Sequence, residues 1–402
     1  MVQQHAQDLG RARRRVQHAL LPGRRAAPAR RRQPPQQGLS HHRPERGHRP
    51  AGLHPGERRR HLAGEQGPEP VAARQQPHGQ GLPHRWLQHP GPRGAERLLR
   101  PAAPGVDDGG LPLLSAEVRT VQVHRYHRSD DGLRLHVSEW LGAAPGAPVL
   151  LCLPGLTRNG RDFARLAARA SAQGWRVLCP DLRGRGLSER DPDPSRYRPD
   201  RYVADVLTLL DHLAVPQVHV VGTSLGGMMG TMLAAMQPGR VRALVLNDVG
   251  PVLEAEGLAR IAGYVGRQPP ATSLDEAVAR TAATQASVFP DFSTDDWRQM
   301  VADTHVVDEG RWVADYDPAI AQGLANGSAV PDLWPLFDAA QAVPMLLLRG
   351  ALSDLLSTAT VAAMRERLPR LQAVEVPMRG HAPTLDEAVA RQAVEGFLAS
   401  VR

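Results

Sequence analysis

Short apolar segments alternate with amphipathic segments along the chain from about residue 114. Apolar runs bounded by Gly or Pro predict buried strands, and stretches with a helical period predict helices. Buried strands are expected at 147–155, 175–184, 217–222, 241–250, 343–350 and 371–380. Helices are expected near 161–173, 200–213, 224–236, 358–368 and 386–401. This alternation predicts an α/β fold with a mostly parallel sheet that helices cover on both faces.

Two parts of this region depart from the alternation. In residues 118–142, apolar and polar residues alternate on both sides of the turn SDDG (129–132), which predicts a β-hairpin at an antiparallel edge of the sheet. Residues from about 250 to 343 instead have the pattern of several helices. An insertion at the functional end of such a sheet predicts a helical cap over a pocket. The cap would carry most of the aromatic side chains: Tyr264, Phe289, Phe292, Trp297, Trp312 and Trp334.

Residues 1 to about 113 are rich in Arg, Pro, Gln, His and Gly and have no hydrophobic period. Such a segment cannot bury enough apolar surface to offset its chain entropy, so we expect an Arg/Pro-rich disordered extension. Residues 1–104 carry a net charge of +14 and the remainder −6, so the total of +8 comes from the front of the chain. A basic nucleic-acid-binding arm is one interpretation. The lysine-free composition, typical of GC-rich codons, favours translation from a false upstream start.

Composition also limits the class of protein. The absence of lysine excludes a lysine-dependent phosphate loop. The two cysteines, Cys152 and Cys179, are too few for a disulfide framework and lack metal-binding spacing, which favours a reducing compartment. No run of about 18 apolar residues indicates a membrane span, and the first residues do not have the pattern of a signal peptide. We therefore expect a cytoplasmic protein without a membrane partner.

The stretch VHVVGTSLGGMMG (218–230) places a serine between glycines directly after an apolar run. Glycine weakens strands and helices, so this cluster indicates a backbone constraint at the end of a strand. The pattern Gly222-x-Ser224-x-Gly226 is typical of a nucleophile elbow, which holds a serine hydroxyl at the edge of a sheet. A dinucleotide-binding loop would need Gly-x-Gly-x-x-Gly, and Ser224 occupies the middle position. We therefore predict that Ser224 is a nucleophile.

Two more strand ends carry groups that would activate such a serine. Asp354 follows the strand at 343–350, and His381 follows the strand at 371–380. The carboxyl ends of parallel strands converge, an imidazole can accept the serine proton, and a carboxylate fixes the imidazole tautomer. Asp248 also ends a strand and is the alternative acid. Asp354 is preferred because its strand directly precedes the strand that leads to His381.

From about residue 118 the sequence resembles the α/β-hydrolase fold superfamily, in particular its lid-bearing esterase, enol-lactonase and meta-cleavage-product hydrolase branch. The matching motifs are LPGLTRNGRDF (153–163), PDLRGRGLSERD (180–191), GTSLG (222–226), the strand-end Asp354 and Gly380-His381. The resemblance implies an eight-stranded sheet. Together with the change of pattern near residue 114, it predicts one hydrolase-fold domain over 114–402 with the cap at about 250–343. It also implies an oxyanion hole made by the backbone N–H groups of Leu156 and Leu225.

Other polar and sulfur-containing residues are interpreted as structural. Asp181 and Arg183 are expected to hold their loop by a salt bridge, and Cys152 and Cys179 are expected to pack in adjacent buried strands, as the resemblance implies. No metal site and no cofactor are predicted. The histidines expected to have only structural roles are His124, His127, His136, His212, His219 and His305.

These features predict a cofactor-free serine hydrolase that cleaves small carboxylic esters through an acyl-enzyme. The cap aromatics predict a closed, mostly apolar pocket that favours short or small cyclic esters over long chains and peptides. The alternative is hydrolysis of an enol-lactone or of a carbon–carbon bond in a ring-cleavage acid, whose carboxylate would need Arg158, Asn159 or Arg311. A distant alternative is an inactive hydrolase-fold protein with a nucleic-acid-binding basic arm. No nucleic acid is expected to bind the folded domain, and the oligomeric state does not follow from the sequence.

Overall fold

The computed structural model of the 402-residue chain describes residues 121–142, 144–325 and 332–402. The predictions for residues 1–113 lie outside these ranges. None of the described helices is both long and apolar enough to span a membrane.

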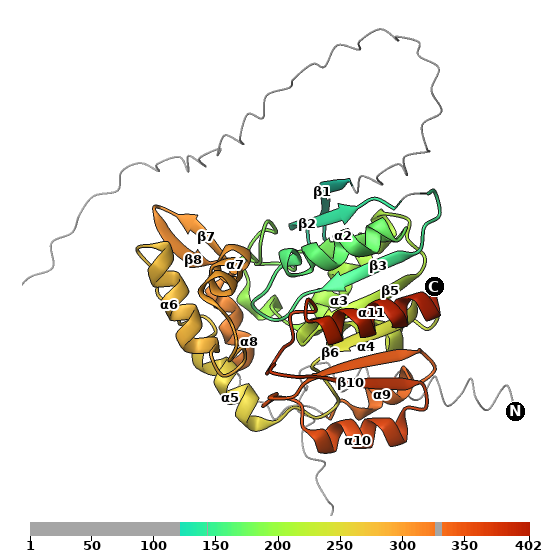
Figure 1. Ribbon diagram of the computed structural model, residues 1–402. Helices are drawn as coiled ribbons and strands as arrows, with labels where there is room; N and C mark the ends of the chain where they lie inside the picture. The colour runs from blue at the N-terminus through green and yellow to red at the C-terminus, as the bar shows by residue number, and fades with distance from the viewer. Residues whose placement is uncertain (1–120, 143, 326–331) are drawn as a thin grey trace, which may run out of the picture. The chain divides into compact units, whose positions relative to one another are not determined.

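Eight strands form one sheet in the order β1-β2-β4-β3-β5-β6-β9-β10 (Figure 1). Every neighbouring pair from β4 to β10 is parallel, whereas β1 pairs with β2 and β2 with β4 in antiparallel fashion. The predicted mostly parallel eight-stranded sheet with an antiparallel edge hairpin is thus confirmed. The strands are β1 (Gln122–Arg128), β2 (Arg134–Trp140), β3 (Val149–Leu153), β4 (Arg176–Pro180), β5 (Val218–Thr223), β6 (Val241–Asn247), β9 (Met345–Gly350) and β10 (Leu371–Val376).

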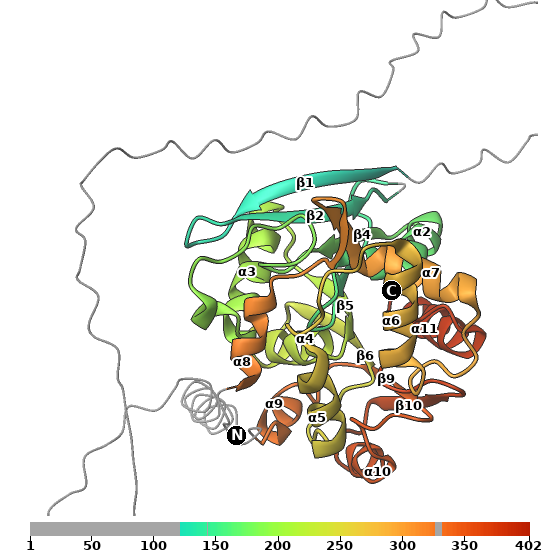
Figure 2. The same cartoon turned by 90° about the vertical axis from the view of Figure 1, so that its left-hand side faces the viewer.

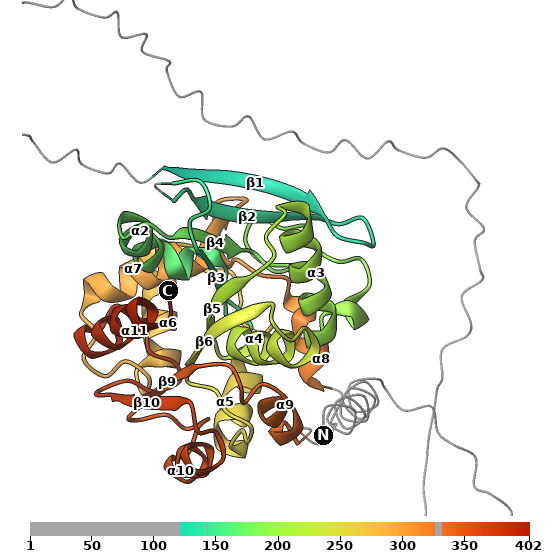
Figure 3. The same ribbon diagram turned by 90° about the vertical axis from the view of Figure 1, so that its right-hand side faces the viewer.

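Helices cover both faces of this sheet (Figure 3). Two apolar cores lie between the sheet and these helices. One layer consists of α2 (Ala164–Ala172) and α11 (Ala388–Val401). The other consists of α3 (Pro199–His212), α4 (Leu225–Met236), α9 (Trp334–Ala339) and α10 (Thr358–Arg367). Strand residues alternate between the two cores, as the strand period requires. Leu150 and Cys152 belong to the core on the side of α2 and α11, whereas Leu151 and Leu153 belong to the core on the side of α3 and α4.

Most of the segment between β6 and β9 forms the cap, which consists of helices α5 to α8 and the hairpin of β7 and β8 and lies on one side of the sheet (Figures 1 and 2). The helices predicted here are present, and part of the segment has its own apolar core around Phe289, Trp297 and Val301. The antiparallel hairpin formed by β7 and β8 was not predicted. The elements are α5 (Ala255–Tyr264), α6 (Leu274–Gln285), α7 (Thr294–Thr304), β7 (His305–Asp308), β8 (Arg311–Ala314) and α8 (Ala321–Ala325).

The two cysteines lie in the neighbouring strands β3 and β4, as the resemblance implied. Cys152 and Cys179 are both free and fully buried. Burial raises the pKa of the Cys179 thiol well above its usual value, with a further contribution from Cys152. A buried protonated thiol packs as a small apolar group, so the pair contributes to the core rather than to chemistry.

His219 in β5 is a buried titratable residue. Its Nε2 lies 3.0 Å from the carbonyl oxygen of Val401 at the end of α11, and its ring meets Trp175 edge to face at 4.8 Å. Its Nδ1 has no hydrogen-bond partner among the described residues. Burial lowers the pKa of His219 below 6.5, so the neutral imidazole is the folded form.

We expect this histidine to make stability depend on pH. Burial lowers the pKa of His219, so the unfolded imidazole takes up a proton at a higher pH than the folded one, and stability is full above about pH 6.5 and falls as the pH is lowered. The slope per histidine reaches at most about 1.4 kcal/mol per pH unit. Urea unfolding between pH 7.5 and pH 5 should give a smaller slope for His219→Gln than for the unaltered protein. Equal slopes would contradict this assignment.

Candidate active site

Ser224 occupies the turn between β5 and α4. Its φ of 52° and ψ of −115° are unusual for a residue with a side chain. Its N–H donates to the carbonyl oxygen of Asn247 at 2.9 Å, which fixes the turn against β6. The conformation is that of the predicted elbow, in which the helix begins directly after the serine.

Two glycines make this turn possible because the backbone is crowded on both sides of Ser224. A Cβ on Gly222 would lie 2.4 Å from the backbone of Gly226. A Cβ on Gly226 would lie 2.0 Å from the carbonyl oxygen of Leu153 in β3. Neither distance is compatible with a side chain, so the Gly-x-Ser-x-Gly spacing follows from contact between the two arms of the turn and the neighbouring strand.

Ser224, His381 and Asp248 form one chain of hydrogen bonds. His381 Nε2 lies 2.8 Å from Ser224 Oγ, and His381 Nδ1 lies 2.8 Å from Asp248 Oδ2. The Asp248 carboxylate is fully buried, and the His381 side chain is 8% exposed. With Nδ1 protonated and donating to Asp248, Nε2 is free to accept the serine proton, which is the arrangement that general-base activation of a serine requires.

The carboxyl side chain of Asp248 is also held by the last residue of β9 and by the loop that follows it. The Gly350 N–H donates to Oδ1 at 2.8 Å, and the Ser353 hydroxyl donates to Oδ2 at 2.6 Å. Next to it, Asn247 donates through Nδ2 to the carbonyl oxygen of Pro383, in the loop that carries His381, at 2.8 Å. Sequence reasoning missed Asn247 and Ser353, although each lies directly beside a candidate acid in the sequence.

The structure contradicts the preference for Asp354 as the partner of His381. Asp354 instead forms a two-pronged ion pair with Arg260 of α5, with Arg260 Nη2 at 2.8 Å from Oδ1. The hydrogen bond from Arg260 lowers the pKa of the Asp354 carboxyl. The acid that contacts His381 is Asp248, the alternative, whose strand β6 lies directly beside β5 in the sheet.

The predicted oxyanion-hole residues lie in the expected places. Leu225 is the first residue of α4, where backbone N–H groups have no partner within the helix. Leu156 follows Gly155, and a Cβ on Gly155 would lie 3.9 Å from Ser224 Cβ, so this loop passes beside the nucleophile. No backbone hydrogen bond to another described residue is formed by either amide. Their catalytic role stays a prediction.

The loop after β4 supports the Leu156 loop. The Arg185 guanidinium donates to the Leu156 carbonyl oxygen at 2.8 Å. The Asp181 carboxylate accepts from the Gly160 N–H at 2.7 Å, and lies 2.8 Å from His136 Nδ1. The predicted salt bridge between Asp181 and Arg183 is therefore wrong, because His136 and backbone amides take the Asp181 carboxylate.

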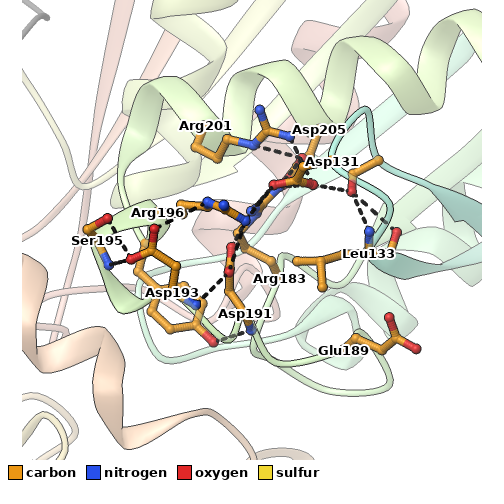
Figure 4. Close-up of polar contacts among 12 residues, drawn as sticks. Asp131, Leu133, Arg183, Glu189, Asp191, Asp193, Ser195, Arg196, Arg201 and Asp205 are labelled. Atoms are coloured by element: carbon orange, nitrogen blue, oxygen red, sulfur yellow. Dashed lines mark hydrogen bonds and ion pairs between the residues drawn. The ribbon is translucent and has the colours of Figure 1, made fainter.

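The buried Arg183 guanidinium is surrounded by acids (Figure 4). It forms ion pairs with Asp131, Asp191 and Asp205. Among the described residues, Asp130, Asp131 and Asp205 are near enough to one another to hold a metal ion. Arg183 and Arg201 already compensate these carboxylates, so we interpret the cluster as an ion-pair network that anchors the loop after β4.

A cavity of about 520 Å³ opens onto Ser224 and His381. The cap contributes Ile261, Tyr264, Phe289, Phe292 and Met300, but also Gln268, Thr281, Gln285, Asp303 and His305. The lining is thus mixed rather than mostly apolar, and none of the three cap tryptophans belongs to it. Trp297 belongs to the apolar core of the cap and Trp312 packs against it, whereas Trp334 packs against the core between the sheet and α4.

Among the three candidates for binding a carboxylate, only Arg158 lines the cavity. Asn159 is buried, and its amide donates to Asp315 and to the backbone of Asp303. Arg311 is exposed on β8. His305, for which only a structural role was expected, also lines the cavity, and burial together with Arg158 lowers the pKa of its imidazole.

Comparison with known proteins points to one family. A family model described as alpha/beta hydrolase fold matches residues 148–388. A 3-hydroxybutyrate-oligomer hydrolase from Cupriavidus necator is 39% identical over 263 residues, which are 62% of this chain and 88% of that protein. A 2-(acetamidomethylene)succinate hydrolase from Mesorhizobium japonicum is 31% identical over 236 residues, 58% of this chain and 81% of that protein. The crystal structure of an alpha/beta hydrolase from Novosphingobium aromaticivorans, 43% identical, covers 70% of this chain and 99% of its own, with a TM-score of 0.66.

The elbow geometry predicts that a methyl group at Gly226 is not tolerated. Gly226→Ala should lower the free energy of unfolding by about 1–3 kcal/mol, because the new Cβ forces the turn away from Leu153. Gly263→Ala, in helix α5, is the matched control, since a Cβ there meets nothing within 4 Å. Urea unfolding measures both variants. Equal stability of the two variants would contradict the proposed crowding at the elbow.

Proposed function

Because the chain belongs to the alpha/beta hydrolase fold family and brings Ser224, His381 and Asp248 together beside a cavity, we propose that it is a serine hydrolase that cleaves small carboxylic esters through an acyl-enzyme. The observation that carries the proposal is the 2.8 Å contact between Ser224 Oγ and His381 Nε2 at the cavity wall. A serine hydroxyl is a weak nucleophile until such a base accepts its proton.

In the proposed acylation, Ser224 Oγ attacks the ester carbonyl carbon while His381 Nε2 accepts the hydroxyl proton. Asp248 remains ionised and stabilises the imidazolium through Nδ1–H. The tetrahedral intermediate collapses, the carbon–oxygen bond to the alcohol breaks, and His381 returns the proton to the departing alcohol. In deacylation, His381 accepts a proton from water, the oxygen of that water attacks the acyl carbon, and Ser224 regains its proton as the acid leaves.

The proposed oxyanion hole uses the N–H groups of Leu156 and Leu225. Each donor aimed at the developing negative charge can lower the barrier by about 3 kcal/mol. Support comes from the position of Leu225 at the first turn of α4 and from the close approach of Gly155 to Ser224. The positive end of the α4 dipole would add to the stabilisation.

The cavity supports small substrates with polar groups. A volume of about 520 Å³ is in the range of small-molecule sites, and its lining offers amide, phenol, hydroxyl and guanidinium groups. Similarity to a 3-hydroxybutyrate-oligomer hydrolase supports esters of short hydroxy acids as the first class to examine. Enol-lactone or carbon–carbon bond hydrolysis would use the same three residues and stays the alternative. Cytoplasmic location and lack of nucleic-acid binding by residues 114–402 stay predictions.

Ser224→Ala should abolish hydrolysis of ethyl butanoate without lowering thermal stability. It should also abolish covalent labelling by a fluorophosphonate, which forms an adduct with an activated serine whatever the natural substrate is. Intact-protein mass spectrometry measures the adduct. Ser195→Ala, at an exposed serine, is the control and should label as the unaltered protein does. Labelling of the Ser224→Ala protein would refute the nucleophile assignment.

The choice of acid is tested by comparing Asp248→Asn with Asp354→Asn. Asp248→Asn should reduce kcat by up to about 10⁴-fold, because His381 would lose its tautomer control. Asp354→Asn should reduce kcat far less, because Asp354 is paired with Arg260. Steady-state kinetics on ethyl butanoate, with circular dichroism as the folding control, decides between them. The reverse order of effects would return the acid role to Asp354.

A further inference from the structure

The backbone and the first side-chain atoms of Arg158 lie close to Ser224, the proposed nucleophile. The Arg158 N–H donates to the Gly155 carbonyl oxygen at 3.2 Å, which closes a tight turn at the end of β3. A Cβ placed on Gly155 would lie 3.5 Å from Arg158 Cγ and 3.9 Å from Ser224 Cβ. The arginine and the serine therefore flank the same glycine, within the reach of one small substrate.

The Arg158 guanidinium has one edge occupied and one edge open. Nε and Nη2 donate to the two oxygens of Asp162 at 2.7 and 2.8 Å. Nη1 donates to no other described residue, which leaves the Nη1–Nη2 edge with its N–H groups unused. The side chain is 30% exposed, and Arg158 belongs to the lining of the cavity. Burial opposes the charge, but Asp162 outweighs it and raises the pKa of Arg158, so the group stays cationic.

The other arginines of the cavity wall are occupied or lie in solvent. Arg161 donates to the Asp303 carbonyl oxygen and to Asp315. Arg379 pairs with Glu387 and Asp291. Arg165 is 62% exposed, where water screens its charge. Arg158 is thus the cavity arginine that combines burial with an open edge.

The neighbours of Arg158 in the cavity wall suit an anionic oxygen group. Tyr264 and Gln285 offer a phenol and an amide, and burial together with Arg158 lowers the pKa of the His305 imidazole, which favours its neutral form. Asp303, the nearby acid not paired with Arg158, accepts from Gln299, and burial raises the pKa of its carboxyl. A planar guanidinium edge binds a carboxylate through two parallel N–H···O bonds, which fixes orientation as well as charge.

We propose that Arg158 binds a free carboxylate of the substrate through its open edge, so that the preferred substrates are ester acids with one carboxylate beside the scissile ester. The inference rests on the proposed ester hydrolysis and names its substrate class. Arg158 takes no part in bond making; it holds the anionic end of the substrate while Ser224 attacks the ester carbonyl.

The test compares matched substrates that differ only in charge. Ethyl hydrogen glutarate carries a carboxylate in the acyl part, and ethyl 5-methylhexanoate has an isopropyl group in its place. Likewise, 3-(butanoyloxy)butanoate carries a carboxylate in the alcohol part, and 4-methylpentan-2-yl butanoate is its neutral counterpart. The two pairs distinguish an acyl-side from an alcohol-side carboxylate. We expect the unaltered protein to prefer the carboxylate in at least one pair by about tenfold or more in kcat/KM.

Arg158→Gln should bring this preference to near unity, mainly through a higher KM for the carboxylate substrate. Arg158→Gln combined with Asp162→Asn removes both charges together and should give the same loss if the single variant does not fold. Arg165→Gln, at the exposed arginine of the same wall, is the matched control and should keep the preference. Retained preference in both Arg158 variants, or no preference in the unaltered protein, would overturn the assignment.

The neutral substrates separate this inference from the proposed function. If hydrolysis of ethyl 5-methylhexanoate depends on Ser224 but no carboxylate preference exists, only the role of Arg158 fails. If Ser224→Ala retains hydrolysis of that neutral ester, the serine mechanism itself fails.

Discussion

The sharp turn at Ser224 is the constraint on which the rest of the site depends. A positive φ is unfavourable for serine, so the surrounding packing has to enforce it. Gly222 and Gly226 allow the arms of the turn and the Leu153 carbonyl to approach more closely than side chains would permit. The consequence is a hydroxyl at the carboxyl edge of a buried strand, directly before the unpaired N–H groups of α4.

The groups around Ser224 are held by hydrogen bonds from neighbouring elements. A fully buried carboxylate is costly unless hydrogen bonds compensate its lost hydration. Asp248 receives them from Gly350, Ser353 and His381, which also aim Oδ2 at the imidazole. Asn247 links the loop of His381 to β6. The loop that carries His381 is therefore held in place by contacts with β6 and with the loop after β9.

Most of the fold and two members of the proposed triad follow from sequence because their signals are local. Apolar runs bounded by Gly or Pro identify the strands, and the elbow glycines identify Ser224. The acid was not predictable in this way, since Asp248 and Asp354 both follow buried parallel strands and both give the order Ser-Asp-His. What distinguishes them is Arg260, which is 94 positions from Asp354 in the chain and occupies its carboxylate. The polarity of the cavity also depends on which faces of the cap helices turn inward, and a helical period does not specify this.

The loop after β9 joins the cap to the proposed catalytic centre. Ser353 donates to Asp248, while the next residue, Asp354, receives Arg260 from α5. The backbone of Asp354 also accepts from the Gly257 N–H, and a Cβ on Gly257 would lie 2.8 Å from that carbonyl oxygen, so α5 is seated closely on the loop. Because α5 also presents Ile261 and Tyr264 to the cavity, one short loop contacts both the proposed catalytic acid and a helix of the cavity wall. Asp354 thus has a structural reason to be present that is separate from proton transfer.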